Sequence, residues 1–248
     1  MSFAFLDKEA CTTKPNLLRG NAPQGTSEDT KADGFTGSVL SGSLGQTTSV
    51  GMIGLQEGSR HVRRKEPEKV LWLHATVAGC RPKIWRRLAV RESMWLSRLH
   101  DCLQIAFDWF DYQTHSFQFD ERRFGNPLKR GELTIEDDRD VTLADLEVST
   151  RSRFVYGYHF GEGWMLEIQV EKVLGLEKGH GYPKCLAGER AGPPEDCGGV
   201  EAYHDMVHCL KGPESDLGRE WREWVGPDYD PEVCSLSKID KAMKRLGR

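Results

Sequence analysis

The sequence predicts an α+β fold: a single domain in which an antiparallel sheet of β-hairpins packs with one helix and precedes a helical carboxyl-terminal part. Two patterns predict this class. Most apolar runs between residues 70 and 173 alternate with period two, whereas apolar residues between 200 and 246 recur every three or four positions. Strands followed by helices are typical of α+β domains, because α/β domains alternate the two.

Six runs of alternating polarity predict the strands, and these runs form three successive hairpins. They are residues 70–78, 84–90, 115–120, 123–125, 154–160 and 164–173. The last pair is joined by Gly161-Glu162-Gly163, where two glycines can adopt the positive φ angles of a tight turn. Between the first two hairpins, Leu96, Leu99, Leu103, Phe107 and Phe110 lie three or four residues apart and predict a helix with one buried stripe.

The remaining segments are predicted as connections and a helical tail. Residues 136–140 are acidic and predict an exposed loop, and Leu143 with Leu146 indicates a short helical turn. A loop rich in Pro and Gly, residues 175–199, separates the sheet from helices expected at 200–211, 214–225 and 236–246.

The amino-terminal quarter differs in composition from the rest. All seven Trp and all six Tyr lie at or after Trp72, and residues 34–58 are dominated by small and polar residues. Such a segment cannot bury enough apolar surface to offset the entropy of ordering it. We therefore expect residues 1–66 to be a disordered, low-complexity extension and residues 67–248 to be the folded domain. The extension ends in a basic cluster, Arg60, His61, Arg63, Arg64 and Lys65, which is either a solvated linker end or a contact for nucleic acid or an acidic partner.

Charge and composition exclude several classes of protein. The formal net charge is -4; residues 1–66 hold 8 basic and 7 acidic residues (+1), which leaves 26 basic and 31 acidic residues (-5) in the domain. A domain whose fold itself binds DNA is usually basic, so this balance argues against one. No apolar run is long enough to span a bilayer, and the acidic start is unlike a signal peptide. Seven cysteines without a Cys-x-x-Cys pair predict reduced thiols in a cytoplasmic protein.

Four motifs follow one another along the predicted domain. They are residues 81–87 (Arg-Pro-Lys-Ile-Trp-Arg-Arg), the Leu99-His100 helix with Trp109 and His115-Ser116-Phe117 after it, residues 158–164 (Tyr-His-Phe-Gly-Glu-Gly-Trp) and the loop 185–199. Together they resemble the plasmid Ri (pRiA) ORF-three-like family, whose members are sometimes labelled IS-element passenger or TnpR-like proteins and occur on plasmids and mobile elements. The resemblance covers residues 68 to 246 and implies a compact α+β domain with no established activity.

This sequence departs from the family pattern at three positions of one turn and at one loop residue. The family turn usually reads Tyr-Asp-Phe-Gly-Asp-Gly-Trp with a His two residues later, whereas this chain has His159, Glu162 and Leu166. Gly192 stands where the family often has Cys. A metal or acid/base site that used those groups would be altered here.

Six residues are candidates for a binding site: His115, Glu162, Trp164, Glu195, Asp196 and Arg86. The first three meet if the second and third hairpins are neighbours in one sheet. Glu195 and Asp196 lie between two prolines and two glycines that hold the loop; they either cap the following helix, bind a cation or pair with Arg86 or Arg87.

Two further patterns resemble metal sites without matching one. His204 and His208 are four residues apart on a predicted helix, but Asp205 stands where a zinc protease has Glu. The eleven-residue gaps between Cys185, Cys197 and Cys209 are unlike the close pairs of structural zinc sites. We interpret both sets as ordinary surface histidines and packed thiols, and we assign no metal, no cofactor and no catalytic residue.

The sequence leaves three functional hypotheses, and the absence of phosphate-loop, dinucleotide and nucleophile-elbow motifs favours the non-enzymatic ones. The first is a binding or accessory module that recognises a protein or a small ligand through its sheet or the 193–199 loop. The second is a small metal-dependent hydrolase that uses His115, Glu162, Glu195 and Asp196. The third is a nucleic-acid-associated protein that uses the basic cluster at 60–65 and the hairpin from Arg81 to Arg91. No membrane association is expected.

Overall fold

The computed structural model describes residues 67–126, 135–158, 163–177 and 179–246. The predicted extension, its basic cluster and Glu162 lie outside these residues. The described strands form one eight-stranded sheet in the order β5-β4-β3-β6-β7-β1-β2-β8. Their bounds are β1 Lys69–Val77, β2 Trp85–Arg91, β3 His115–Phe119, β4 Arg122–Gly125, β5 Glu136–Asp137, β6 Arg153–Tyr158, β7 Trp164–Gly175 and β8 Lys184–Glu189. The described helices are α1 Leu96–Phe107, α3 Gly199–Lys211, α4 Asp216–Val225 and α5 Leu236–Leu246.

The three predicted hairpins are present, and the α+β class is confirmed. Strand β1 pairs antiparallel with β2 on one side and with β7 on the other. The β3–β4 and β6–β7 hairpins join through an antiparallel β3–β6 pair. Only β4 and β5 run parallel among the described pairs.

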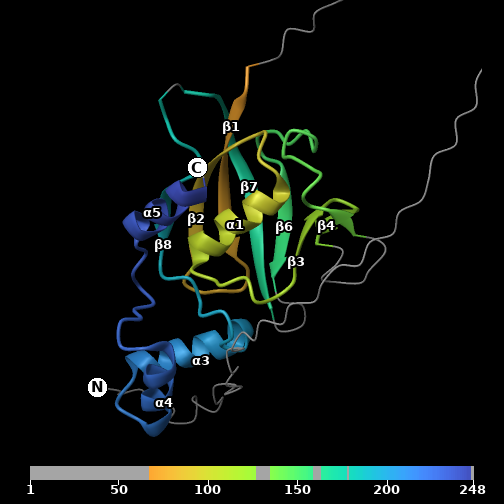
Figure 1. Cartoon of the computed structure of the whole chain (residues 1–248). Helices are drawn as coiled ribbons and strands as arrows, with labels where there is room; N and C mark the ends of the chain where they lie inside the picture. The colour runs from red at the N-terminus through yellow and green to blue at the C-terminus, as the bar shows by residue number, and fades with distance from the viewer. Residues whose placement is uncertain (1–66, 127–134, 159–162, 178, 247–248) are drawn as a thin grey trace, which may run out of the picture. The chain divides into compact units, whose positions relative to one another are not determined.

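Helix α1 covers one face of this sheet (Figure 1). Strand β1 turns Leu71, Leu73 and Ala75 to that face, where they are fully buried with Leu99 and Leu103 of the helix in one apolar cluster. Burying a Leu side chain contributes on the order of 2 kcal/mol, so this layer is the main source of stability. The helix ends earlier than its apolar spacing predicts, because Asp108 adopts a left-handed conformation with φ 63°, and Phe110 beyond it is exposed.

Two short strands were missed by the sequence analysis. The predicted loop 136–140 contains the two-residue strand β5, and Asp138 just after it is buried rather than exposed. The predicted loop 175–199 contains β8, which pairs with β2. Neither segment alternates in polarity, and Ala187 and Gly188 have low strand propensity, so tertiary pairing decides both structures.

Helix α5 lies alongside the edge strand β8 (Figure 1). Asp240 of α5 accepts a hydrogen bond from the backbone N–H of Cys185, at 2.9 Å. Ile239 and Met243 of the same helix are buried in the main apolar cluster. The helix therefore joins the core and also satisfies a backbone donor of the last strand.

Helix α3 is tied to the end of β8 by a cluster of three charged residues. Arg190, which follows β8 and is buried, pairs with Glu232, and Glu232 also pairs with Lys211 at the end of α3. At the start of α4, the Ser215 hydroxyl accepts a hydrogen bond from the Gly218 N–H, as an N-cap residue does. No described helix is long and apolar enough to cross a membrane.

Most described cysteines are packed thiols. Cys80, Cys102, Cys185, Cys197 and Cys234 are free, and burial raises the pKa of Cys102, Cys185 and Cys197 to about 12. These three thiols therefore stay protonated and unreactive at neutral pH.

We expect Gly192→Ala to destabilise the protein by about 3 kcal/mol, because a Cβ at position 192 would lie 1.8 Å from the Phe107 carbonyl oxygen and cannot be accommodated without moving backbone. The control is Gly181→Ala, where a Cβ meets nothing within 4 Å. Urea unfolding of both variants measures the difference. Equal stability of the two variants would show that the approach of this loop to α1 is not as close as described.

We expect Glu232→Gln to lower stability at pH 7 and to have little effect near pH 2. Hydrogen bonds from Arg190, then from Lys211, lower the pKa of Glu232 to about 2 from its ordinary 4.5. A carboxylate whose pKa is lower in the folded state stabilises it above about pH 4.5, and this contribution is lost as pH falls toward 2. Thermal unfolding from pH 2 to 7 measures it. Glu214→Gln, which breaks an ion pair between exposed partners, is the control and should have almost no effect at any pH.

Candidate functional site: a buried histidine cluster and an open groove

His115 and Trp164 lie in one row across the sheet, with Tyr158 between them. In the strand register, His115 pairs with Tyr158 and Tyr158 pairs with Trp164. All three side chains are buried on the face that α1 covers. The condition on which their proximity depends, that the second and third hairpins are neighbours, is therefore met, although His115 and Trp164 are separated by one strand.

Glu195 joins this row to the loop after α1. Its carboxylate accepts hydrogen bonds from the Phe110 N–H, at 2.7 Å, and from the Tyr158 hydroxyl. Its backbone carbonyl accepts one from the Trp164 indole, at 2.9 Å. Of the alternatives considered for the acidic pair, capping of the next helix is not what the structure has, because Gly198 is the N-cap of α3 and no side chain caps it. Glu195 is instead a buried connection between three segments.

The other predicted site residues do not join this group. Asp196 is exposed. Arg86 is buried, and its guanidinium donates to the backbone carbonyls of Ala106, Trp85 and Glu189 at 2.8 to 2.9 Å. Because carbonyls of the chain occupy its donors, Arg86 has an internal role in this structure.

A stacked pair of histidines lies beside the row. The rings of His100, from α1, and His115 are almost parallel with centroids 3.6 Å apart. Asp111 lies 3.0 Å from His100 Nε2, and Asp138 lies 2.6 Å from His115 Nε2. The sequence analysis singled out His115 as a site residue but did not single out its neighbours His100, Asp111 and Asp138. These three residues come from separate segments that only the fold brings together.

Hydrogen bonds and burial determine the protonation of this pair. The Tyr156 hydroxyl lies 2.7 Å from His100 Nδ1 and accepts a hydrogen bond from the Gln104 amide, at 2.9 Å. Burial, with a further contribution from His115, lowers the pKa of His100 to about 4. The His100 ring is therefore neutral at pH 7. Burial also raises the pKa of Tyr156 well above its ordinary value, so its hydroxyl remains a proton donor.

Within the part of the chain that the structure describes, one group of side chains could hold a metal ion: His100, Asp111 and His115. The patterns considered from sequence do not form such a group. His204 accepts a hydrogen bond from the Arg81 N–H, at 3.1 Å, and so supports the β1–β2 turn. The thiols of Cys185 and Cys197 donate to nearby carbonyls.

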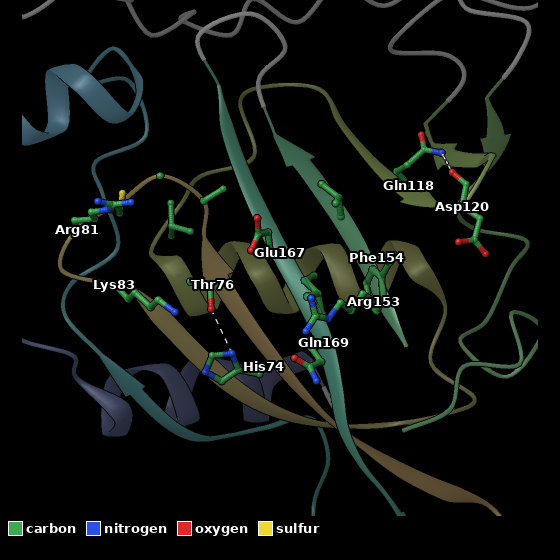
Figure 2. A pocket seen from close by; sticks show the side chains of 16 residues that line it. His74, Thr76, Arg81, Lys83, Gln118, Asp120, Arg153, Phe154, Glu167 and Gln169 are labelled. Atoms are coloured by element: carbon green, nitrogen blue, oxygen red, sulfur yellow. Dashed lines mark hydrogen bonds between the residues drawn. The ribbon is translucent and has the colours of Figure 1, made fainter. Parts of the chain in front are cut away.

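The opposite face of the sheet carries an open groove of about 830 Å³ (Figure 2). His74 and Thr76 of β1, Glu167 and Gln169 of β7, and Arg153 of β6 point into it, while α1 lies behind the strands. The β1–β2 turn and the end of β3 complete the lining with Arg81, Lys83, Gln118 and Asp120. Its lining thus combines an apolar floor with charged side chains, among them three cations and two carboxylates.

The basic hairpin from Arg81 to Arg91 does not present one cationic surface. Arg87 forms a two-point ion pair with Glu171, and Arg91 pairs with Glu68. Since Arg86 points into the core, Arg81 and Lys83 are the cations of this hairpin that reach the groove.

Comparison with known proteins relates residues 69–238 to a family model described as "Plasmid pRiA4b ORF-3-like protein". The chain belongs to this family. The uncharacterized protein y4hQ of Sinorhizobium fredii (strain NBRC 101917 / NGR234) is 31% identical over 180 residues, which is 72% of this chain and 92% of that protein. A crystal structure of MM3350 from Methanosarcina mazei Go1, a protein of unknown function, is similar with 33% identity and a TM-score of 0.62, and the match covers 68% of this chain and 97% of that one.

In this family member we expect Glu195→Ala to lower stability by about 3 kcal/mol, because the change leaves the Phe110 N–H and the Tyr158 hydroxyl without their buried acceptor. The neighbouring variant Asp196→Ala removes an exposed carboxylate and should change stability by less than about 0.5 kcal/mol. Chemical unfolding measures both. If the two variants lost equal stability, Glu195 would not be the connection described.

Proposed function

We propose that this protein is a non-enzymatic cytoplasmic binding module, and that its ligand is a small carboxylate-bearing molecule held in the groove on the open face of the sheet. The observation that carries the proposal is the groove itself. Its volume of about 830 Å³ lies within the range of ligand sites, on the order of 300–1,000 Å³. Rigid strands on either side of it supply a preformed surface.

The charges in the groove support a ligand with few, separated negative groups. Lys83 and Arg153 form no ion pair or hydrogen bond through their side chains with the described residues, so both can donate hydrogen bonds to an anionic ligand. Glu167 and Asp120 lie in the same lining and would repel a dense polyanion. This mixture favours a carboxylate-bearing molecule over a nucleic-acid backbone.

Two observations weigh against the hydrolase hypothesis as first framed. The Glu195 carboxylate is occupied by internal hydrogen bonds. The side chain of the next residue, Asp196, is exposed and so does not share the buried position of Glu195 and His115. Of the two recognition elements considered for a binding module, the 193–199 loop is therefore engaged in the fold, while the sheet face remains accessible.

The test titrates glutarate, as a small dicarboxylate, and citrate, as a small tricarboxylate, into the full-length protein by isothermal calorimetry. We expect the double variant Lys83→Gln/Arg153→Gln to bind the better of the two probes at least about tenfold more weakly, since one charge-assisted hydrogen bond contributes on the order of 1.5–3 kcal/mol.

Arg98→Gln/Arg219→Gln is the matched control, because it also removes two positive charges, from exposed positions on α1 and α4 outside the groove. It should bind like the unchanged protein. Absence of binding of both probes, or equal weakening by the control, would contradict the proposal.

A further inference from the structure

We propose that His100, Asp111 and His115 form a binding site for a divalent transition-metal ion of the zinc class. One nitrogen of each ring and one carboxylate oxygen of Asp111 all lie within 4.8 Å of one another. A zinc ion binds nitrogen at about 2.0–2.1 Å and carboxylate oxygen at about 2.0–2.2 Å, so small side-chain movements bring three such atoms onto one ion. The site lies on the helix-covered side of the sheet and is independent of the groove.

The decisive observation is a buried ring nitrogen of His115 that has no hydrogen-bond partner. The His115 Nε2 lies 2.6 Å from a carboxylate oxygen of Asp138, which can only accept a hydrogen bond when ionised. The neutral ring has one proton, so Nε2 donates it and Nδ1 holds a lone pair. That Nδ1 atom is buried and has no hydrogen-bond partner. A buried acceptor without a partner costs on the order of 1–3 kcal/mol, and a bound cation would satisfy it.

Asp138 has the position of an outer-shell carboxylate. Metal-binding histidines commonly donate their second ring N–H to a carboxylate, which fixes the tautomer and makes the binding nitrogen more basic. Asp138 is itself buried just after β5, the strand that pairs with β4. The sheet therefore holds Asp138, and Asp138 in turn orients the His115 ring.

His100 has the matching arrangement on the helix side. Its Nε2 faces Asp111, and its Nδ1 faces the Tyr156 hydroxyl. When a cation binds Nε2, the ring proton lies on Nδ1 and is donated to the hydroxyl oxygen, which has two lone pairs. The contact between His100 and Tyr156 that orients the free ring would then orient the ligand, with donor and acceptor exchanged.

The donor set and the exposure of Asp111 define the class of ion. Two imidazoles and one carboxylate suit zinc and its transition-metal neighbours, whereas magnesium and calcium prefer all-oxygen sites. The Asp111 side chain is 45% exposed while both histidines are buried. The cation can therefore reach the site from the Asp111 side, and a fourth position remains for water or a ligand.

The test treats the full-length protein with a chelator, removes the chelator and titrates Zn²⁺ by isothermal calorimetry. We expect one ion per chain and a melting temperature that rises with Zn²⁺ concentration. Asp111→Asn should weaken binding at least about tenfold and abolish most of the thermal shift. Asn is well suited to this position because it tolerates the left-handed backbone, with φ 57° at Asp111.

Asp138→Asn separates the outer-shell role from a general loss of structure. It should remain folded by circular dichroism and weaken Zn²⁺ binding by roughly 10–100-fold. His208→Ala, which removes an imidazole from the other histidine pair, should bind like the unchanged protein. The proposal is overturned if the unchanged protein binds no stoichiometric Zn²⁺, if Asp111→Asn binds as tightly, or if His208→Ala loses the binding.

Discussion

Glu195 links the loop after α1 to the paired ends of β6 and β7. Its carboxylate contacts the loop after α1 and the end of β6, and its carbonyl contacts the first residue of β7. The contacts with Tyr158 and Trp164 are buried and the one with Phe110 is partly buried, so leaving these donors without an acceptor is costly. The loop that carries Asp111 is thus held at its start by Phe110, and β3 begins four residues after Asp111, at His115. The histidine cluster depends on this one carboxylate for its geometry although Glu195 is not part of it.

The two faces of the sheet satisfy their polar groups in different ways. On the face under α1, polar side chains are few, buried and hydrogen-bonded to one another, as in the network of His100, Tyr156 and Gln104. On the open face, solvent reaches the charged side chains, and ion pairs such as Arg87 with Glu171 coexist with Lys83 and Arg153, which form no such pair with the described residues. Period-two alternation produces both environments from the same strands.

The sequence predicted the elements with strong periodicity and missed those that depend on tertiary contacts. Strand β1 and helix α1 bury one regular stripe each, so their patterns were visible. Strand β8 contains Ala187 and Gly188 and exists because β2 pairs with it and α5 covers it. Among the site residues, His115 was found because it opens an alternating strand. Asp138 was assigned to an exposed loop because an acidic run is usually solvated, and nothing in the local sequence indicates the histidine that buries it.

The hydrogen bond from the Cys185 N–H to Asp240 has a consequence for association between molecules. An edge strand with free backbone donors is a template on which another chain can add a strand. Here the last strand of the sheet has one of those donors occupied by a side chain and is flanked by a helix, while the opposite edge, β5, is only two residues long. A chain cut before residue 236 would lose the helix and expose the β8 edge, which is a template for intermolecular strand addition and for aggregation.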